Sequence, residues 1–278
     1  MKLDLTTTWG VVGDATPNGW NGPDMPFYKS TVNPSEFVAY VTLTDGEIKF
    51  RENNDWSNNY GDDGADGTLE PGGANIAVSA GTYKITLNLS ALTYKIETFS
   101  WGVVGDAAPN GWNGPDVAFE YVPTTDTWKA LVKLAAGEIK FRQNNDWANN
   151  LGDDGADGTL EPGGANIAVE AGNYLIELNL NDNTYVMTKV ENVWGVVGSA
   201  TPNEWNGPDV KLAMDFTKEG VWYANNVTLK DGEIKFRANE SWDNNYGSND
   251  ADGNLQAGGA NIAVVEGVYD IVLDLSNP

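Results

Sequence analysis

The sequence predicts an all-β protein built from three tandem β-sandwich modules. Three observations lead to this fold class: a long motif set occurs three times, hydrophobic residues alternate with a period of two, and turn residues are frequent. The 278 residues include 32 Gly and 12 Pro, a composition that favours short strands joined by tight turns. No stretch of ten residues shows the apolar stripe of an amphipathic helix.

Three motifs recur in the same order along the chain. The first reads WGVVGDATPNGWNGPD in its first copy, and its copies occupy Trp9–Asp24, Trp101–Asp116 and Trp194–Asp209. The second, GEIKFR, occupies Gly46–Arg51, Gly137–Arg142 and Gly232–Arg237. The third, GGANIAV, begins at Gly72, Gly163 and Gly258. We therefore expect modules at residues 1–98, 99–190 and 191–278, because repeats of this length are whole structural units.

Alternation within each module predicts half-buried strands. In residues 82–89, Tyr83, Ile85 and Leu87 alternate with polar residues, so one face of that strand should pack on a core. Residues 128–134 alternate in the same way. The third module has one extra residue between Trp222 and Leu229, which predicts a β-bulge there.

The two chain ends suggest a shift of one strand relative to the repeats. Modules 1 and 2 each close with a strand, Leu92–Glu97 and Asn183–Thr188, whereas the sequence stops just before the equivalent strand of module 3. One interpretation is a shortened last module. The other is that Lys2–Leu5 fills the open edge near Leu275, within one chain or between chains, by strand donation.

Charge and composition exclude several classes of function. Sixteen basic against 40 acidic residues give a net charge of −24, which argues against nucleic-acid or anionic-membrane partners. With no His and no Cys, imidazole catalysis, thiolate catalysis, zinc sites and disulfides are absent. No apolar run is long enough to span a membrane, and Met1–Thr8 lacks the pattern of a signal peptide, as expected of a mature fragment.

The strand GEIKFR and the segment after it carry the candidate binding residues. Alternation places Ile48 and Phe50 inward and leaves Glu47, Lys49 and Arg51 on the opposite face. Residues 53–60 then form a loop of amides and aromatics that includes Trp56. An exposed indole is a rigid apolar plate suited to the apolar face of a sugar ring, and amides, carboxylates and guanidinium groups can pair its hydroxyls.

Each of these residues also has a plainer interpretation. Trp56 could fix its own loop, Trp20 could be a second plate or a turn residue, and Lys49 and Arg51 could balance the acidic surface. The tryptophans that open the modules begin apolar strands and are expected in the core. These residues are Trp9, Trp101 and Trp194.

An acidic loop, GDDGADG at residues 61–67, recurs at 152–158 and in altered form at 247–253. Clustered carboxylates between glycines suit Ca²⁺, although the bidentate Glu of a calcium-binding loop is missing, and Asp-Gly runs are also common solvated turns. We expect no cofactor, with Ca²⁺ as an alternative. The candidate ligands are Asp62, Asp63, Asp66, Asp153, Asp154, Asp157, Asp250 and Asp252.

Together, the three motifs resemble the C-terminal modules of the SusE/SusF family of outer-membrane starch-binding lipoproteins. The resemblance extends from Trp9 to about Leu275. It implies immunoglobulin-like, non-catalytic β-sandwiches that hold α-glucan against an aromatic pair with Lys, Arg and Asn partners. The residues it implies are Trp20, Lys49, Arg51, Asn53 and Trp56 in module 1, Trp112, Lys140, Arg142, Asn144 and Trp147 in module 2, and Trp205, Lys235, Arg237, Asn239 and Trp242 in module 3.

Two departures make module 1 the most typical expected site. In module 2, Leu151 replaces the tyrosine found at Tyr60 and Tyr246. In module 3, Glu204 stands before Trp205, where the other modules have glycine. The lipidated Cys of such lipoproteins is also absent from the sequence.

The expected function is non-catalytic, multivalent binding of a neutral polysaccharide, most simply starch, at the outer face of the outer membrane or in secreted form. A glycosidase would need one pair of carboxyl groups in a single cleft, which three similar modules do not offer. SusC/SusD-like transport proteins are expected neighbours, and a monomer is expected unless strands are exchanged. The alternative is a structural repeat of a surface rod or filament, stabilised by calcium and assembled by strand donation.

Overall fold

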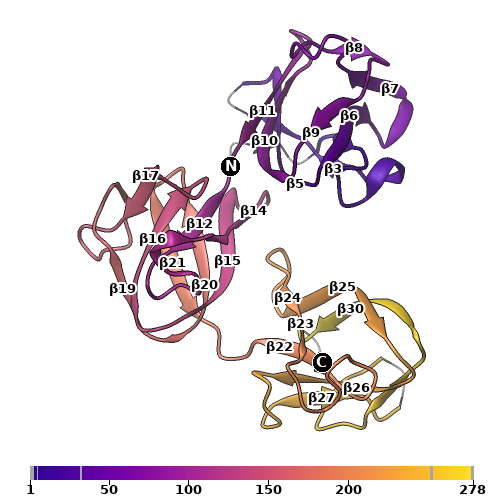
Figure 1. The fold of residues 1–278 in the computed structure, drawn as a ribbon, viewed down its shortest axis with the longest axis vertical. Helices are drawn as coiled ribbons and strands as arrows, with labels where there is room; N and C mark the ends of the chain where they lie inside the picture. The colour runs from indigo at the N-terminus through magenta and orange to yellow at the C-terminus, as the bar shows by residue number, and fades with distance from the viewer. Residues whose placement is uncertain (1–2, 5, 32, 251–252, 277–278) are drawn as a thin grey trace. The chain divides into compact units, whose positions relative to one another are not determined.

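The computed structural model describes residues 3–4, 6–31, 33–250 and 253–276 and confirms the all-β fold of three tandem β-sandwich modules. In each module the strands form two layers (Figure 1). The helical elements of this described part are two 3-10 turns, η1 at Gly19–Asn21 and η2 at Gly111–Asn113. Among the residues described, no helix has the length and apolar character needed to cross a membrane.

Module 1 pairs a sheet that carries the repeated Trp motifs with a second sheet that closes the core. The first sheet has the order β3-β2-β6-β7-β8, with β9 also paired to β6, and the second has the order β1-β4-β5-β10-β11. The strands are β1 Leu3–Asp4, β2 Trp9–Val12, β3 Met25–Pro26, β4 Tyr28–Ser30, β5 Glu36–Leu43, β6 Gly46–Glu52, β7 Asp55–Gly61, β8 Glu70–Pro71, β9 Ile76–Val78, β10 Gly81–Asn88 and β11 Thr93–Thr98.

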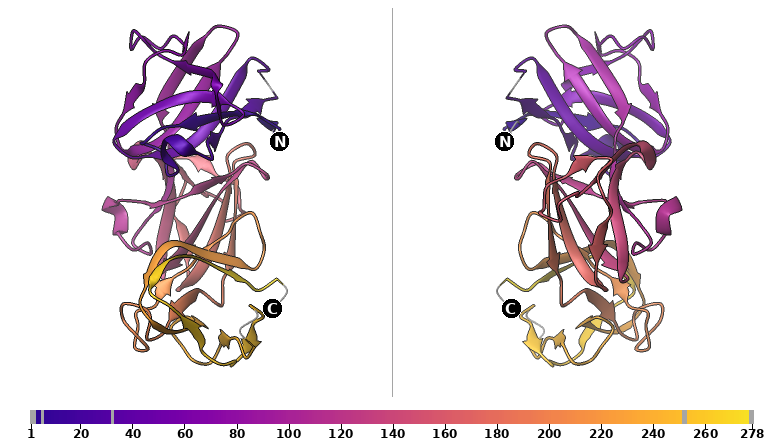
Figure 2. Two further views of the ribbon diagram at one scale, coloured as in Figure 1. Left: turned by 90° about the vertical axis from the view of Figure 1, so that its right-hand side faces the viewer. Right: turned by 90° about the vertical axis from the view of Figure 1, so that its left-hand side faces the viewer.

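Module 2 repeats this arrangement, with sheets β13-β12-β16-β17-β18 and β14-β15-β20-β21, and β19 paired to β16. Figure 2 shows the strands of the modules from two further sides. Its strands are β12 Trp101–Val104, β13 Val117–Ala118, β14 Glu120–Val122, β15 Thr127–Leu134, β16 Gly137–Gln143, β17 Asp146–Gly152, β18 Glu161–Pro162, β19 Ile167–Val169, β20 Gly172–Asn179 and β21 Thr184–Lys189.

Module 3 keeps the first sheet and has a smaller second one. Its sheets are β23-β22-β26-β27-β28, with β29 paired to β26, and β24-β25-β30. The strands are β22 Trp194–Val197, β23 Val210–Lys211, β24 Ala213–Met214, β25 Val221–Leu229, β26 Gly232–Ala238, β27 Asn245–Gly247, β28 Gln256–Ala257, β29 Ile262–Val264 and β30 Gly267–Asp274.

The core of module 1 lies between the inner faces of its two sheets. Ile48 and Phe50 point into it from β6, and Ile85 and Leu87 from β10, all fully buried as the alternation predicts. Burial of each such side chain contributes about 1.5–3 kcal/mol to folding. Trp9 is also buried, in agreement with the expected core role of the tryptophans that open the modules.

The predicted bulge in module 3 is present. The register of β25 against β30 shifts between Ala224 and Val227, and Asn226 adopts a left-handed backbone conformation with φ of 56°. The extra residue is accommodated there because a bulge lets two residues oppose one on the partner strand.

The N-terminal segment does not complete module 3 within this chain. β1 pairs with β4 at the edge of module 1, with Leu3 opposite Ser30 and Asp4 opposite Lys29. The alternative of strand donation within one chain to the edge near Leu275 is therefore wrong. The flanking Lys2 and Leu5 lie outside the described residues.

The chain divides into two compact units, one of Met1–Ala171 with Ile176–Met187 and the other of Gly172–Leu175 with Thr188–Pro278. In the first unit, aromatic side chains of modules 1 and 2 meet. The ring of Tyr40 lies 4.5 Å from that of Tyr121 and 5.0 Å from that of Trp128 between centroids, and Phe99 lies 5.5 Å from Trp128. Burial and the nearby Asp126 raise the pKa of Tyr40 to about 12. This contact uses none of the candidate binding tryptophans of the two modules, Trp20, Trp56, Trp112 and Trp147.

Candidate functional site

In modules 1 and 2 the segment after GEIKFR is a hairpin instead of a long loop, whereas in module 3 residues 239–244 form a loop before β27. Asn53 and Asn54 form the turn between β6 and β7, and both have positive φ, 58° and 55°. Two successive left-handed residues match the turn type that suits the twist of a hairpin, and Asn tolerates that conformation better than most residues. Trp56 consequently lies on β7, in the irregular stretch between the pairs Glu52–Asp55 and Arg51–Asn59.

Trp56 forms a pair with Trp20, which η1 brings to the same face. Their ring centroids lie 6.0 Å apart with an angle of 36° between the planes. Trp56 exposes 44% of its surface and Trp20 is half-buried. Two tilted indoles on an open surface form a shallow apolar platform, which we call the Trp platform.

The Trp platform has the same geometry in all three modules. The centroid distance is 6.0 Å for Trp112–Trp147 and for Trp205–Trp242, with interplanar angles of 36° and 39°. Trp147 and Trp242 expose 44% and 46% of their surface. Glu204, which replaces a glycine beside Trp205, has φ of 54° and therefore keeps the backbone conformation of that glycine.

Arg51 supports the platform from beneath and is not an exposed cation. It is 2% exposed, and its guanidinium carbon lies 4.5 Å from the centroid of the Trp56 ring. Its Nε and Nη2 donate to the two carboxylate oxygens of Asp24 at 2.8 and 2.7 Å. The expectation of a surface position is wrong because the chain around Asp24 covers this face of β6.

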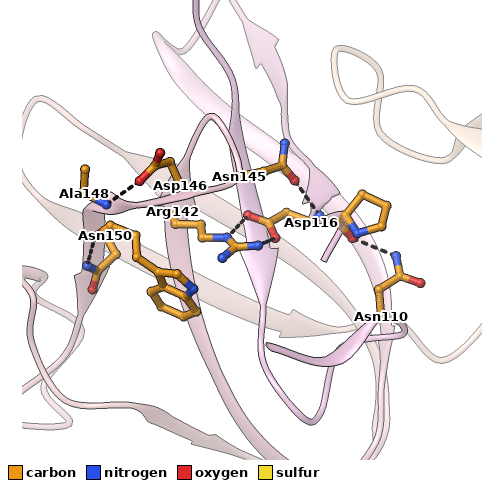
Figure 3. Close-up of polar contacts among 9 residues, drawn as sticks. Asn110, Asp116, Arg142, Asn145, Asp146, Ala148 and Asn150 are labelled. Carbon is orange, nitrogen blue, oxygen red and sulfur yellow. Dashed lines mark hydrogen bonds and ion pairs between the residues drawn. The ribbon is translucent and has the colours of Figure 1, made fainter. Parts of the chain in front are cut away.

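The same arrangement recurs in the other modules. Figure 3 shows Arg142 paired with Asp116 in module 2. In module 3 the pair is Arg237 and Asp209, and the guanidinium lies 4.7 Å from the indole centroid in both modules. The hydrogen bonds that Arg51 donates to Asp24 raise the pKa of Arg51 despite burial, and those that Arg237 donates to Asp209 do the same for Arg237. The cation is therefore permanent, and its attraction to the indole face fixes the plate.

The NGPD part of the first motif positions the aspartate. Gly22 has φ of 74°, and a Cβ there would lie 3.1 Å from Nη2 of Arg51 and 2.9 Å from Oδ1 of Asp24, so glycine leaves room for the ion pair. The backbone N–H of Asp24 donates to Oδ1 of Asn54 at 2.7 Å. The amide of Asn18 donates to the carbonyl of Pro23 at 2.7 Å. The motif is thus a clamp for Arg51.

Lys49 also differs from its predicted position. It is 8% exposed, and Nζ donates to the carbonyl of Gly73 at 2.6 Å. Lys140 and Lys235 are buried to a similar degree. Burial lowers the pKa of Lys49 and of Lys140, an effect that nearby aspartates partly offset. The expectation that these lysines lie on an exposed face is wrong, because the GGANIAV segment covers them.

The turn asparagines hold the chain that enters each module. Oδ1 of Asn144 accepts from the backbone of Ser100 at 2.8 Å, and its Nδ2 donates to the carbonyl of Thr98. Asn239 makes the equivalent bonds to Val193 and Glu191. The backbone N–H of Asn53 donates to the carbonyl of Thr8 at 2.7 Å. In modules 2 and 3, these side-chain groups are occupied inside the protein.

The acidic loops satisfy their own backbone. Asp62 is 4% exposed, and its carboxylate accepts from the backbone of Gly64, Asp66 and Gly67 and from the hydroxyl of Tyr94. Burial raises its pKa, but these bonds outweigh that effect and hold the pKa below the usual value. Asp153 behaves in the same way, with Tyr185 as the hydroxyl donor.

These bonds leave no calcium cage in the part of the chain that the structure describes, where no group of three or more acidic side chains is placed to hold a cation. Asp63 instead accepts from the backbone of Ala74, and Asp66 accepts from Thr68. The prediction of a metal site is therefore not supported at these positions, and Asp252 lies outside the described residues. The physical reason is that the carboxylates act as loop caps.

The departure at Leu151 does not touch the platform. Tyr60 packs against Trp9 with centroids 5.6 Å apart, and Tyr246 packs against Trp194 at 5.4 Å. Leu151, the equivalent in module 2, is 8% exposed. These residues therefore belong to the core, and the substitution leaves the exposed indoles unchanged.

The residues that sequence reasoning missed are Asp24, Asp116 and Asp209. Each pairs with the buried arginine of its module. The signal that could have identified them is the identity of the NGPD segment in the three copies of the first motif. Asn59 was also passed over: its Nδ2 donates to the carbonyl of Trp56 at 2.7 Å and helps to fix that residue.

The described residues thus define a class of protein: tandem β-sandwich modules, each with an open apolar platform. The family model described as "SusF/SusE starch specific CBMs", where CBM denotes a carbohydrate-binding module, matches residues 8–95 and 101–186. These ranges make up more than half of the chain, which therefore belongs to this family.

Among solved structures, the crystal structure of SusF from Bacteroides thetaiotaomicron is similar to this chain at 18% sequence identity. The match covers 98% of this chain and 71% of that chain, with a TM-score of 0.30. No curated protein matches the chain.

Proposed function

We propose that the chain binds starch through its three Trp platforms at once and retains the polymer without cleaving it. The observation that carries this proposal is the threefold recurrence of one exposed indole pair, with the same 6.0 Å separation each time. A folded core does not require such pairs on an open surface, whereas the apolar faces of sugar rings need flat, rigid partners.

The tilt of the indoles favours a curved ligand. Planes inclined by 36–39° can each stack on a different ring of a bent chain such as an α-glucan, whereas a flat ribbon would fit coplanar plates better. Polar groups surround the plate: Asn58 donates to Glu52 at 2.8 Å, and both lie near the platform on the hairpin. Membership of a family of starch-specific modules supports the same ligand.

In this proposal the contact residues are the tryptophans, and the cations act behind them. Arg51 and Lys49 are buried, so they stabilise the platform and its sheet instead of pairing with sugar hydroxyls. Three weak sites on one polymer gain apparent affinity through effective concentration, because the second and third contacts become intramolecular. The same family membership supports a place at the cell surface, beside SusC/SusD-like transport proteins that would receive the glucan.

Affinity electrophoresis in gels that contain amylopectin tests the proposal. We expect the wild type to be retarded and Trp56→Ala, Trp147→Ala and Trp242→Ala each to restore part of the mobility, with the triple variant close to the mobility without glucan. Loss of one plate should cost about 2 kcal/mol at its site, as for a central aromatic contact. Val186→Ala, at a 60% exposed position away from the platforms, is the matched control and should migrate like the wild type.

Titration with maltoheptaose gives an independent count of sites. Three sites per chain, and two after Trp242→Ala, are expected. Unretarded wild type in amylopectin and no heat with maltoheptaose would refute the proposal. A melting temperature that rises with calcium under those conditions would favour the scaffold alternative.

A further inference from the structure

Modules 1 and 2, which lie in one compact unit, share an aromatic contact apart from their Trp platforms. Tyr40 points away from the core of module 1, and its ring lies 4.5 Å from that of Tyr121 and 5.0 Å from that of Trp128 between centroids. Phe99, between the two modules, lies 5.4 Å from Tyr40 and 5.5 Å from Trp128. We call these four rings the aromatic junction. Tyr40 contacts the other three.

Module 2 holds its two rings of the aromatic junction in place. Trp128 is 4% exposed on β15 and lies opposite Tyr121 of β14. The hydroxyl of Tyr121 donates to Oδ1 of Asp126 at 2.8 Å, and Asn181 donates to Oδ2 of the same carboxylate at 2.9 Å. Burial and the bond to Asp126 raise the pKa of Tyr121, so its hydroxyl remains a donor. Module 2 therefore presents a fixed aromatic surface to module 1.

The linker between these modules is short and is held by both of them. Two residues, Phe99 and Ser100, separate β11 from β12. The N–H of Phe99 donates to the carbonyl of Thr82 in module 1 at 2.9 Å. The side chain of Asn144 in module 2 accepts from the N–H of Ser100 and donates to the carbonyl of Thr98. Thr98 thus ends the last strand of module 1 and is also bound by module 2.

The linker before module 3 is two residues longer. Val190 stands at the place of Phe99, since its N–H extends the sheet of module 2 in the same way. Asn239 of module 3 then binds Val193 and Glu191, which lie two places further along the linker than their counterparts before module 2. The two contacts that coincide at one residue in the first linker are therefore separated in the second.

The aromatic residues are also specific to the first junction. Leu131 of β15 stands where β5 has Tyr40, six residues before the GEIKFR motif in both modules. Met214, opposite the first Trp of β25, stands where β14 has Tyr121. The sandwich fold is kept with these aliphatic residues, so it does not by itself require the aromatic ones.

We propose that the aromatic junction and the short linker are positioning elements that fix modules 1 and 2 as a rigid pair, so that their two Trp platforms bind one glucan at a set separation. This inference rests on the proposed function and adds a length requirement to it. Neighbouring domains move relative to one another unless a hydrophobic contact prevents it. A rigid pair lowers the entropy that is lost when the second platform binds.

Trp242→Ala leaves the platforms of modules 1 and 2 and is the parent for a calorimetric test of glucan length. Maltoheptaose measures each platform singly, and amylose fractions of increasing length test whether one glucan reaches both. We expect the apparent affinity to rise about tenfold or more over a narrow range of lengths, where the glucan begins to span the pair. Added Tyr40→Ala should make this rise about threefold smaller and spread it over more lengths, with the Kd for maltoheptaose unchanged.

Two controls and two contrary results make this test decisive. Tyr40→Phe keeps the ring contacts and should behave like the parent, as should Val186→Ala. Tyr40→Ala with the length dependence of the parent would overturn the inference, as would a loss of maltoheptaose binding in that variant. Absence of maltoheptaose binding in the parent would instead refute the proposed function.

Pulsed electron double resonance measures the rigid pair without any glucan. The chain has no cysteine, so Ala77→Cys and Ala168→Cys together place one spin label on module 1 and one on module 2. Both positions are exposed and lie on the equivalent strands β9 and β19. We expect a distance distribution as narrow as that of Ala77→Cys with Lys95→Cys, a pair within module 1.

Two variants loosen the pair in different ways. Tyr40→Ala removes the central ring, which lies outside the core of module 1, and a Gly-Ser insertion after Phe99 gives the linker the length that it has before module 3. Either change should broaden the distance distribution between the labels, and Tyr40→Phe should leave it narrow. A broad distribution without these changes, or a narrow one that neither change affects, would overturn the inference.

Discussion

Module 3 matches modules 1 and 2 in one sheet and differs from them in the other. The Trp platform, the buried arginine and its aspartate recur with nearly identical distances. In the second sheet, β30 has one neighbour among the described residues, and Ser248 replaces the aspartate that receives a tyrosine hydroxyl in the other modules.

This difference teaches that the binding surface and the closure of the core are separable. Every contact that fixes the platform lies within the first sheet and the turn after η1: Arg51 reaches Asp24 and Trp56, and Asn54 reaches the backbone of Asp24. The last strands of modules 1 and 2, β11 and β21, contribute none of these contacts. A change of the tyrosine on β11 or β21 should therefore leave the platform of its module in place.

Removal of the aspartate that pairs with the buried arginine should have the largest effect on stability, and the effect should be the same in all modules. Asp24→Ala leaves Arg51 buried without its counter-charge, which we expect to destabilise module 1 by about 3 kcal/mol or more. Asp116→Ala and Asp209→Ala should do the same to modules 2 and 3. Scanning calorimetry of the full chain would measure each loss, together with weaker retardation in amylopectin. A clearly smaller loss in module 3 would show that its platform is not built like the others.

Removal of the hydroxyl of Tyr94 on β11 or of Tyr185 on β21 should have a smaller effect, confined to the module that carries it. Tyr94→Phe leaves the carboxylate of Asp62 short of one donor, and Tyr185→Phe does so for Asp153. We expect a lower melting temperature for the affected module by calorimetry, with glucan binding unchanged. Tyr83→Phe, whose hydroxyl donates to the backbone of Ser79, is the control on β10. Weaker binding of amylopectin by Tyr94→Phe would contradict the separation of the two sheets.

The smallest of the expected effects is the loss of stability that acid causes in modules 1 and 2. The pKa values of Asp62 and Asp153 are lowered in the folded state, so these carboxylates stabilise the protein above their unfolded pKa of about 3.9 and lose that contribution as pH falls through the lower folded value. Ser248 has no such contribution to lose. Asp62→Ser gives module 1 the residue that module 3 has at Ser248. By calorimetry, the melting temperature of this variant should fall less between pH 5 and pH 3 than that of the wild type. Equal losses would contradict this role of Asp62.

Sequence reasoning identified the exposed tryptophans but misplaced the cations beside them. Alternation along β6 correctly puts Ile48 and Phe50 in the core, and the other face was taken to meet solvent. Both faces are in fact covered, since Asp24 lies over Arg51 and Gly73 over Lys49. A period of two identifies the two faces of a strand but does not tell whether a distant turn covers the second one.

The acidic loops illustrate the same limit. Their composition suits a calcium site as well as a solvated turn. Only the fold shows that the carboxylate of Asp62 accepts hydrogen bonds from three backbone N–H groups and from the hydroxyl of Tyr94, which lies on the distant strand β11. In module 3 Ser248 stands at the place of Asp62, and its Oγ is buried without a hydrogen-bond partner among the described residues.

The sequence by itself determined the number of modules, the strand periodicity, the bulge in β25 and the exposed tryptophan after GEIKFR, because repeats, alternation and turn residues are local properties. Only the tertiary structure decided which charges are buried and which carboxylates cap their own loops. Those outcomes depend on segments far apart in the chain, such as Asp24 with Arg51 and Tyr94 with Asp62, whose contact follows from the packing of whole sheets.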